Sequence, residues 1–169
     1  DFTFDDVCLY DPAVYQNISS VASGSIVAFA WDFGNGTTST DQQPVGQQYI
    51  LPGFYDIELA TESNNGCVDT LTQTIEMFPV PTAMFDFDSV CYPSVTSFTD
   101  LSSVGGAYNV FGWEWKFGDG IVETGTQNPT HLYTAWGDYS IQLTVTTDAG
   151  CLADTILGPA RVHPKPEAD

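Results

Sequence analysis

Basic residues are scarce in this chain of 169 residues, which has 3 Lys and Arg against 22 Asp and Glu and a formal net charge of -19. Such a surface repels nucleic acid, because binding to phosphates depends on Lys and Arg. It equally repels an anionic membrane surface. The same charge suits cations such as Ca²⁺, or it simply keeps the protein soluble.

Long apolar runs and recognisable catalytic arrangements are also absent. No apolar run approaches the ~20 residues of a membrane span, and no signal peptide is recognisable, so we expect no direct membrane insertion. The two histidines, His131 and His163, are not part of a motif with a Ser or Cys nucleophile. We therefore expect no enzymatic activity and no required cofactor, and we expect the chain to be a monomer.

Two copies of one pattern fill the sequence. Cys8 aligns with Cys91, and the segment Trp31-Asp32-Phe33-Gly34-Asn35-Gly36 aligns with Trp115-Lys116-Phe117-Gly118-Asp119-Gly120. Further anchors keep the offset between 83 and 85 residues. A fixed period of this kind indicates tandem structural modules.

Closely spaced prolines separate the copies. We expect one domain over residues 1–80 and a second over residues 81–166, with a Pro-rich linker at residues 79–81. Prolines at this spacing favour an extended, semi-rigid connection. Because the chain begins abruptly at Asp1 and Pro164-Lys165-Pro166 repeats the linker, we expect it to be part of a longer array.

The repeated segments alternate with a period of two residues. In Trp113-Glu114-Trp115-Lys116-Phe117 the odd positions are aromatic and the even ones charged, which is typical of half-buried strands. Asn35-Gly36 and Asp119-Gly120 predict tight hairpin turns. Since no segment has a helical period, we predict an all-β chain of two tandem sandwiches with about seven strands each.

The same structural residues are predicted in both copies. Alternating aromatic residues form the core, glycines form turns, and a Tyr after each Pro-Gly or Trp-Gly turn forms a tyrosine corner, in which its hydroxyl bonds to nearby backbone. The set is Trp31, Phe33, Gly34, Gly36 and Tyr55 in the first copy, and Trp115, Phe117, Gly118, Gly120 and Tyr139 in the second.

These motifs resemble the PKD (polycystic kidney disease) domain family. The family's Trp-Asp-Phe-Gly-Asp-Gly run corresponds to residues 31–36 and 115–120, and its later motifs correspond to Asn128-Pro129-Thr130-His131-Leu132-Tyr133 and Pro52-Gly53-Phe54-Tyr55. Lys116, Asn35 and Trp136 depart from the family pattern. The resemblance implies an immunoglobulin-like β-sandwich in each copy.

The cysteines and Pro-x-Pro linkers are similar to one PKD subgroup, found in large secreted surface proteins of Bacteroidetes that include gliding-motility adhesins. This resemblance implies a spacer at the cell surface or outside the cell, with neighbouring PKD-like domains of the same polypeptide as partners. The alternative is an accessory module of a secreted hydrolase that binds extracellular protein or polysaccharide. Trp136, in a turn, is the aromatic side chain expected to be exposed.

Each copy has one early and one late cysteine. Cys8 and Cys67 are 59 residues apart, Cys91 and Cys151 are 60 apart, and the close pairs of zinc sites are absent. Pairing within each copy is the economical hypothesis, and two free thiols per copy is the alternative. A disulfide implies an oxidising compartment.

The resemblance also suggests a Ca²⁺ site. Some PKD domains hold Ca²⁺ between the loop that precedes the Trp strand and a late loop, where the second copy has Asp100 and Asp148 and the first has Ser23 and Asn64. Carboxylate oxygens suit Ca²⁺. The competing interpretation is that these Asp side chains cap turns.

Overall fold

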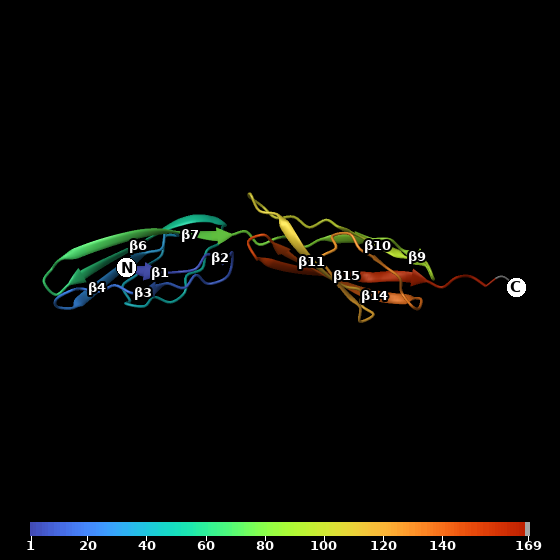
Figure 1. The fold of residues 1–169 in the computed structure, drawn as a ribbon, viewed down its shortest axis with the longest axis horizontal. Coiled ribbons are helices and arrows are strands. Elements are labelled where there is room, and N and C mark those ends of the chain that lie inside the picture. The colour runs from blue at the N-terminus through green and yellow to red at the C-terminus, as the bar shows by residue number, and fades with distance from the viewer. Residues whose placement is uncertain (168–169) are drawn as a thin grey trace. The chain divides into compact units, whose positions relative to one another are not determined.

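The computed structural model describes residues 1–167 and consists of two compact units, Asp1–Pro79 and a second that begins at Val80 (Figure 1). Fifteen strands and no helix lie within the described residues, so the all-β prediction is confirmed. It follows that this part of the chain contains no helix of a length and apolarity that could cross a membrane.

The first unit is built from seven strands in two sheets. The larger sheet has the order β2-β7-β6-β4-β5, and the smaller pairs β1 with β3. The strands are β1 (Phe2–Thr3), β2 (Val7–Cys8), β3 (Gln16–Asn17), β4 (Ile26–Asp32), β5 (Thr38–Ser39), β6 (Gly53–Ser63) and β7 (Val68–Phe78).

The second unit repeats this plan with a longer small sheet. Its sheets have the orders β12-β11-β14-β15-β9 and β13-β10-β8. The strands are β8 (Phe85–Phe87), β9 (Val90–Cys91), β10 (Thr96–Asp100), β11 (Val110–Lys116), β12 (Val122–Thr124), β13 (Thr130–His131), β14 (Gly137–Thr147) and β15 (Leu152–His163).

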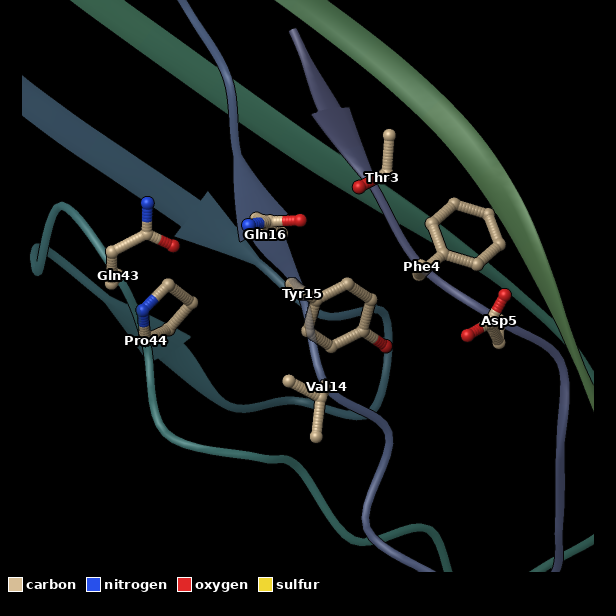
Figure 2. Close-up of a pocket in the computed structure, with 8 residues that line it drawn as sticks. All are labelled: Thr3, Phe4, Asp5, Val14, Tyr15, Gln16, Gln43 and Pro44. Atoms are coloured by element: carbon tan, nitrogen blue, oxygen red, sulfur yellow. The ribbon is translucent and has the colours of Figure 1, made fainter.

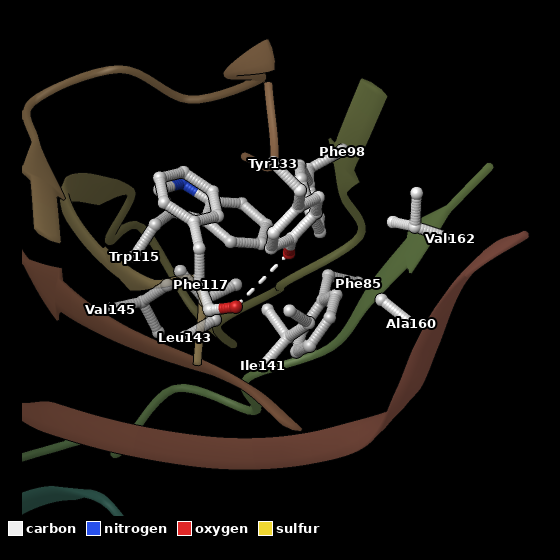
Figure 3. Packing of buried hydrophobic residues seen from close by; sticks show 10 residues of the cluster. All are labelled: Phe85, Phe98, Trp115, Phe117, Tyr133, Ile141, Leu143, Val145, Ala160 and Val162. Carbon is white, nitrogen blue, oxygen red and sulfur yellow. Dashed lines mark hydrogen bonds between the residues drawn. The ribbon is translucent and has the colours of Figure 1, made fainter. Parts of the chain in front are cut away.

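The alternating residues fill the space between the two sheets of each unit. Trp115 and Phe117 are fully buried, whereas Lys116 between them is exposed and pairs with Glu114 at 3.2 Å. Figure 3 shows the core of the second unit, which consists of Phe85, Phe98, Trp115, Phe117, Tyr133, Ile141, Leu143, Val145, Ala160 and Val162. The first unit buries Trp31 and Phe33 in the same way, with stacked rings 5.9 Å apart.

The indole groups of the core are tied to the chain by hydrogen bonds. Trp31 donates from Nε1 to the carbonyl oxygen of Asp41, and Trp115 donates to that of Thr126, both at 3.0 Å. A buried indole N–H needs such a partner, because an unpaired donor in an apolar core is costly. The two bonds fix equivalent loops over equivalent tryptophans.

Candidate functional site

The Trp-x-Phe-Gly-x-Gly motif forms a turn that closely approaches the neighbouring strand. Gly34 and Gly118 have φ angles of +68° and +81°, and a Cβ at either position would lie 2.6 or 2.5 Å from the carbonyl oxygen of Asp56 or Ser140. Glycine is required there both for its backbone angle and for its lack of a side chain. Asn35-Gly36 predicted a hairpin turn, and β4 and β5 pair antiparallel across a connection of residues 33–37.

His131 has a structural position in the second unit. Its ring stacks on Phe117 with centroids 4.2 Å apart, and its Nε2 lies 2.8 Å from Asp119 Oδ2. Burial alone would raise the pKa of Asp119, but hydrogen bonds from His131 and from the Ile121 amide outweigh it and lower the pKa. In the first unit, Asn35 takes the place of Asp119 and accepts bonds from Thr37.

Four tyrosine hydroxyls close the same loops in both units. Tyr55 and Tyr139 donate to the carbonyl oxygens four residues before them, Leu51 at 2.8 Å and Ala135 at 3.0 Å, which is the geometry of a tyrosine corner. Tyr49 donates to the carbonyl of Phe33 at 2.8 Å, and Tyr133 donates to the carbonyl of Phe117 at 3.0 Å. Figure 3 shows the bond from Tyr133 as a dashed line.

Asp100 and Asp148 are both engaged as hydrogen-bond acceptors. Asp100 accepts from the Ser102 amide on Oδ1 and from Trp113 Nε1 and Gln127 Nε2 on Oδ2. Asp148 accepts from Asn109 through both carboxylate oxygens.

Within residues 1–167 no group of three or more His, Cys, Asp or Glu side chains is arranged to hold a metal ion. A Ca²⁺ role for Asp100 and Asp148 stays a prediction. The strand register also identifies Asn17 as the counterpart of Asp100, since Phe2 pairs with Asn17 and Phe85 with Asp100. The sequence alignment, which lacks an anchor in this segment, missed it.

The predicted disulfides within each copy are wrong. Cys8 and Cys151 are disulfide-bonded, whereas Cys67 and Cys91 are free and exposed. The reason lies in the fold of the first unit, where Cys8 pairs with Phe78 at the end of β7 and Cys67 immediately precedes the start of that strand. Eleven residues of strand span about 36 Å, far beyond the roughly 4.4–6.8 Å between the Cα atoms of a disulfide.

The second unit separates its cysteines in the same way. Cys91 pairs with His163, the last residue of β15, and Cys151 immediately precedes the first residue of that strand. The sequence spacing of 59 or 60 residues permitted pairing, but it did not reveal that one long strand lies between the two cysteines.

A groove of about 530 Å³ lies on the first unit, at the small sheet. Its lining residues, shown in Figure 2, are Thr3, Phe4, Asp5, Val14, Tyr15, Gln16, Gln43 and Pro44. Pairing between β1 and β3 covers only Phe2 and Thr3, so the chains separate at Phe4. In the second unit the ladder continues through Phe87 and Phe98. No sequence motif marks this groove, because it results from the early end of the strand pairing.

Exposed aromatic side chains lie elsewhere on the surface. Trp136 is 63% exposed, and Phe54 and Phe111 are 72% and 76% exposed. They lie on different elements and their positions do not define a site. The groove is therefore the candidate binding surface that combines aromatic, amide and carboxylate groups.

The two units are tandem β-sandwiches of one construction, and comparison with known proteins gives the family. The family described as "PKD domain" matches residues 5–79 and 78–157. The chain belongs to the PKD domain family, and the predicted resemblance is confirmed in both copies.

Relatives of this chain include proteins of Vibrio. The chain is 31% identical over 140 residues to a pre-pro-metalloprotease, PrtV, of Vibrio cholerae, covering 81% of the chain and 15% of that protein. It is 39% identical over 57 residues to a microbial collagenase of Vibrio alginolyticus, covering 34% of the chain and 7% of that protein. The chain thus spans less than a sixth of the length of either relative.

Two solved structures of single modules are similar to parts of this chain. The PKD1 domain of Vibrio anguillarum Epp is 26% identical with a TM-score of 0.46, covering 51% of this chain and 96% of that structure. The PKD1 domain of PrtV is 30% identical with a TM-score of 0.44, covering 52% and 99%. These relatives are not Bacteroidetes adhesins, and the adhesin and gliding-motility assignment stays a prediction.

Proposed function

We propose that this chain is a non-catalytic accessory segment of a larger extracellular hydrolase. The observation that carries the proposal is its 31% identity, over most of its own length, to a small fraction of a pre-pro-metalloprotease. The second relative, a collagenase, supports the same assignment over a shorter stretch. This favours the accessory-module alternative over the adhesin spacer.

The chemistry of the turns supports a non-catalytic role. His131 forms a hydrogen bond with Asp119 in the turn of the Trp motif, and the ring of His131 is stacked on that of Phe117. These side chains stabilise loops and leave no geometry for an activated nucleophile around them. The disulfide bonding of Cys8 and Cys151 supports an oxidising, extracellular location.

The groove on the first unit is the surface that we assign to contact with an extracellular polymer. The half-buried ring of Phe4 offers apolar surface, and the exposed side chain of Gln16 offers an amide donor and acceptor near it (Figure 2). Binding sites combine apolar surface with a few polar groups that fix orientation. Because one relative is a collagenase, we propose an insoluble protein polymer as the ligand.

Co-sedimentation tests this proposal. The chain is expected to sediment with insoluble collagen fibres, to sediment less with crystalline cellulose, and to release no peptides from the fibres. Phe4→Ala should weaken binding several-fold. The matched control is Phe87→Ala, because Phe87 packs on Phe85 and Phe98 at 6.1 Å as Phe4 packs on Phe2 at 6.0 Å and on Tyr15 at 6.1 Å. Peptide release by the purified chain would refute the accessory role.

A further inference from the structure

The chain contains two Asn-Gly steps, Asn35-Gly36 and Asn65-Gly66, and both lie in turns of the first unit. An Asn followed by Gly is prone to deamidation, because the next backbone nitrogen can attack the side-chain amide and Gly has no Cβ to obstruct it. Gly36 and Gly66 have φ angles of +87° and +78°, and a Cβ at either position would meet nothing within 4 Å. Crowding around the glycine therefore closes neither turn to the reaction.

Three hydrogen bonds hold the side chain of Asn35, which is half-buried. Its Oδ1 accepts from the amide of Thr37 at 3.0 Å and from Thr37 Oγ1 at 2.6 Å. Its Nδ2 donates to the carbonyl oxygen of Gln48 at 3.1 Å. Attack by the Gly36 nitrogen requires the side-chain amide to turn its carbon toward that nitrogen, and this movement competes with all three bonds.

Asn65 lies in the turn that joins β6 to β7, and its side chain is exposed. Within residues 1–167 no hydrogen bond to this side chain is formed. The Gly66 amide, which supplies the attacking nitrogen, donates to the carbonyl oxygen of Ser63 at 2.9 Å. Deamidation at Asn65 therefore requires one hydrogen bond to open, compared with the three that hold the side chain of Asn35.

The second unit forms the same turn without an Asn. In each unit the Gly amide donates to the carbonyl oxygen three residues earlier, at 2.9 Å from Gly66 and at 2.9 Å from Gly150. The residue before that Gly is Asn65 in the first unit and Ala149 in the second. The turn therefore forms without an Asn side chain, and a substitution at residue 65 can remove the reactive group while the turn keeps its fold.

We propose that Asn65 is a site of spontaneous deamidation in the folded chain, and that its hydrogen bonds protect Asn35 from the same reaction. The Gly66 nitrogen attacks Cγ of Asn65 and forms a C–N bond, and its proton passes through water to the departing amide nitrogen, which leaves as ammonia. Water then opens the resulting succinimide to aspartate or isoaspartate. The net reaction consumes one water and releases one ammonia. This inference does not rest on the proposed hydrolase function.

The modification also changes the length of the turn. Isoaspartate carries the main chain through the side-chain carbons, which adds one methylene group to the connection between β6 and β7. The amide of Ser63 donates to the carbonyl oxygen of Cys67 at 2.9 Å, and this bond closes the end of the hairpin. A longer turn holds that bond less well, so isoaspartate at residue 65 is expected to speed hydrogen exchange of the Ser63 amide.

Incubation of the complete chain in mildly alkaline buffer made with heavy-oxygen water tests the proposal, because hydrolysis of the succinimide incorporates solvent oxygen. Chymotrypsin cleaves at aromatic residues between the two sites, and mass spectrometry then measures the label in each peptide. The peptide with Asn65 should gain label several-fold faster than the peptide with Asn35. In urea the two rates should become similar, since Gly follows both Asn residues. Asn65→Ala should abolish the label in its own peptide and leave the rate at Asn35 unchanged.

Thr37→Val tests the protection of Asn35 while Asn65 stays intact. The substitution removes the hydroxyl that donates to Asn35 Oδ1, so deamidation at Asn35 should become faster and the rate at Asn65 should not change. An unchanged rate at Asn35 in this variant would refute the protection. If Asn35 in the folded wild-type chain reacts as fast as Asn65, or if Asn65 does not react, the proposal is overturned. This wild-type comparison decides the matter even if Thr37→Val fails to fold.

Discussion

At the scale of single residues, the repeated glycines meet two different structural requirements, a positive φ angle and a close approach to a neighbouring backbone. Gly118 has a positive φ and also touches the backbone of Ser140, whereas Gly120 has a φ of +94° with open space around it. In the sequence both are simply turn glycines. The difference between them depends on which strand packs beneath the turn, and a local motif does not contain that information.

Replacing these two glycines separates the cost of a side chain at positive φ from the cost of a steric clash with the neighbouring strand. Gly120→Ala should lower the free energy of unfolding by about 1–2 kcal/mol, the cost of a side chain at positive φ. Gly118→Ala should cost a further ~1–3 kcal/mol, because its Cβ would displace the backbone of β14. Urea denaturation measures both, and equal losses would show that the close approach to Ser140 carries no energy.

Asp119 gives the second module an acid-sensitive contact. Its pKa is lowered in the folded state, so its stabilising contribution is complete above the ordinary value of 3.8 and is lost as the pH falls through the folded value. Asp119→Asn should therefore reduce stability at pH 7, and the difference from wild type should shrink below about pH 4. Melting temperatures across this range measure it. A difference that does not change with pH would contradict the role of the ionised carboxylate.

At the scale of elements, tyrosine hydroxyls fasten the loops to the strand ends. Tyr133 is 1% exposed and donates to the carbonyl of Phe117, which is itself fully buried, whereas the bond from Tyr139 to Ala135 is exposed. Removing the first hydroxyl leaves a buried acceptor without a partner, and removing the second leaves one that water can reach.

Tyr133→Phe should cost about 1–3 kcal/mol of unfolding free energy, the penalty for an unsatisfied buried group. Its matched control, Tyr139→Phe, should cost ~1 kcal/mol or less, because water replaces the lost partner. Guanidinium denaturation compares the two variants. A larger loss for Tyr139→Phe would show that the tyrosine corner, and not the buried bond, holds this loop.

Local patterns predicted the strands well and the long-range connections poorly. Alternation around Trp115 and the Pro-Gly or Trp-Gly steps before Tyr55 and Tyr139 identified strands and corners, because each depends on near neighbours in the chain. The prediction of the cysteine pairing failed because it depends on the lengths of β7 and β15. These strands have 11 and 12 residues, and each separates the two cysteines of its unit. The groove at Phe4 was missed because it depends on where strand pairing ends.

At the scale of the whole molecule, the net charge of -19 opposes compaction. Added NaCl should raise the melting temperature, since the Debye length falls from ~10 Å at 0.1 M to ~3 Å at 1 M. If Asp100 and Asp148 also bind Ca²⁺, CaCl2 should raise it further than MgCl2 of equal ionic strength, and Asp148→Asn should remove the excess. If both salts raise the melting temperature equally, charge screening alone accounts for the rise and the Ca²⁺ prediction is rejected.

As accessory domains, these modules would serve a hydrolase without taking part in its chemistry. The most direct test deletes residues 1–169 from the complete protein that carries them and compares two substrates. We predict that hydrolysis of a soluble chromogenic peptide is unchanged, whereas hydrolysis of insoluble collagen falls several-fold. A parallel loss of activity on the soluble peptide would contradict the account, because it would place these modules within the catalytic machinery.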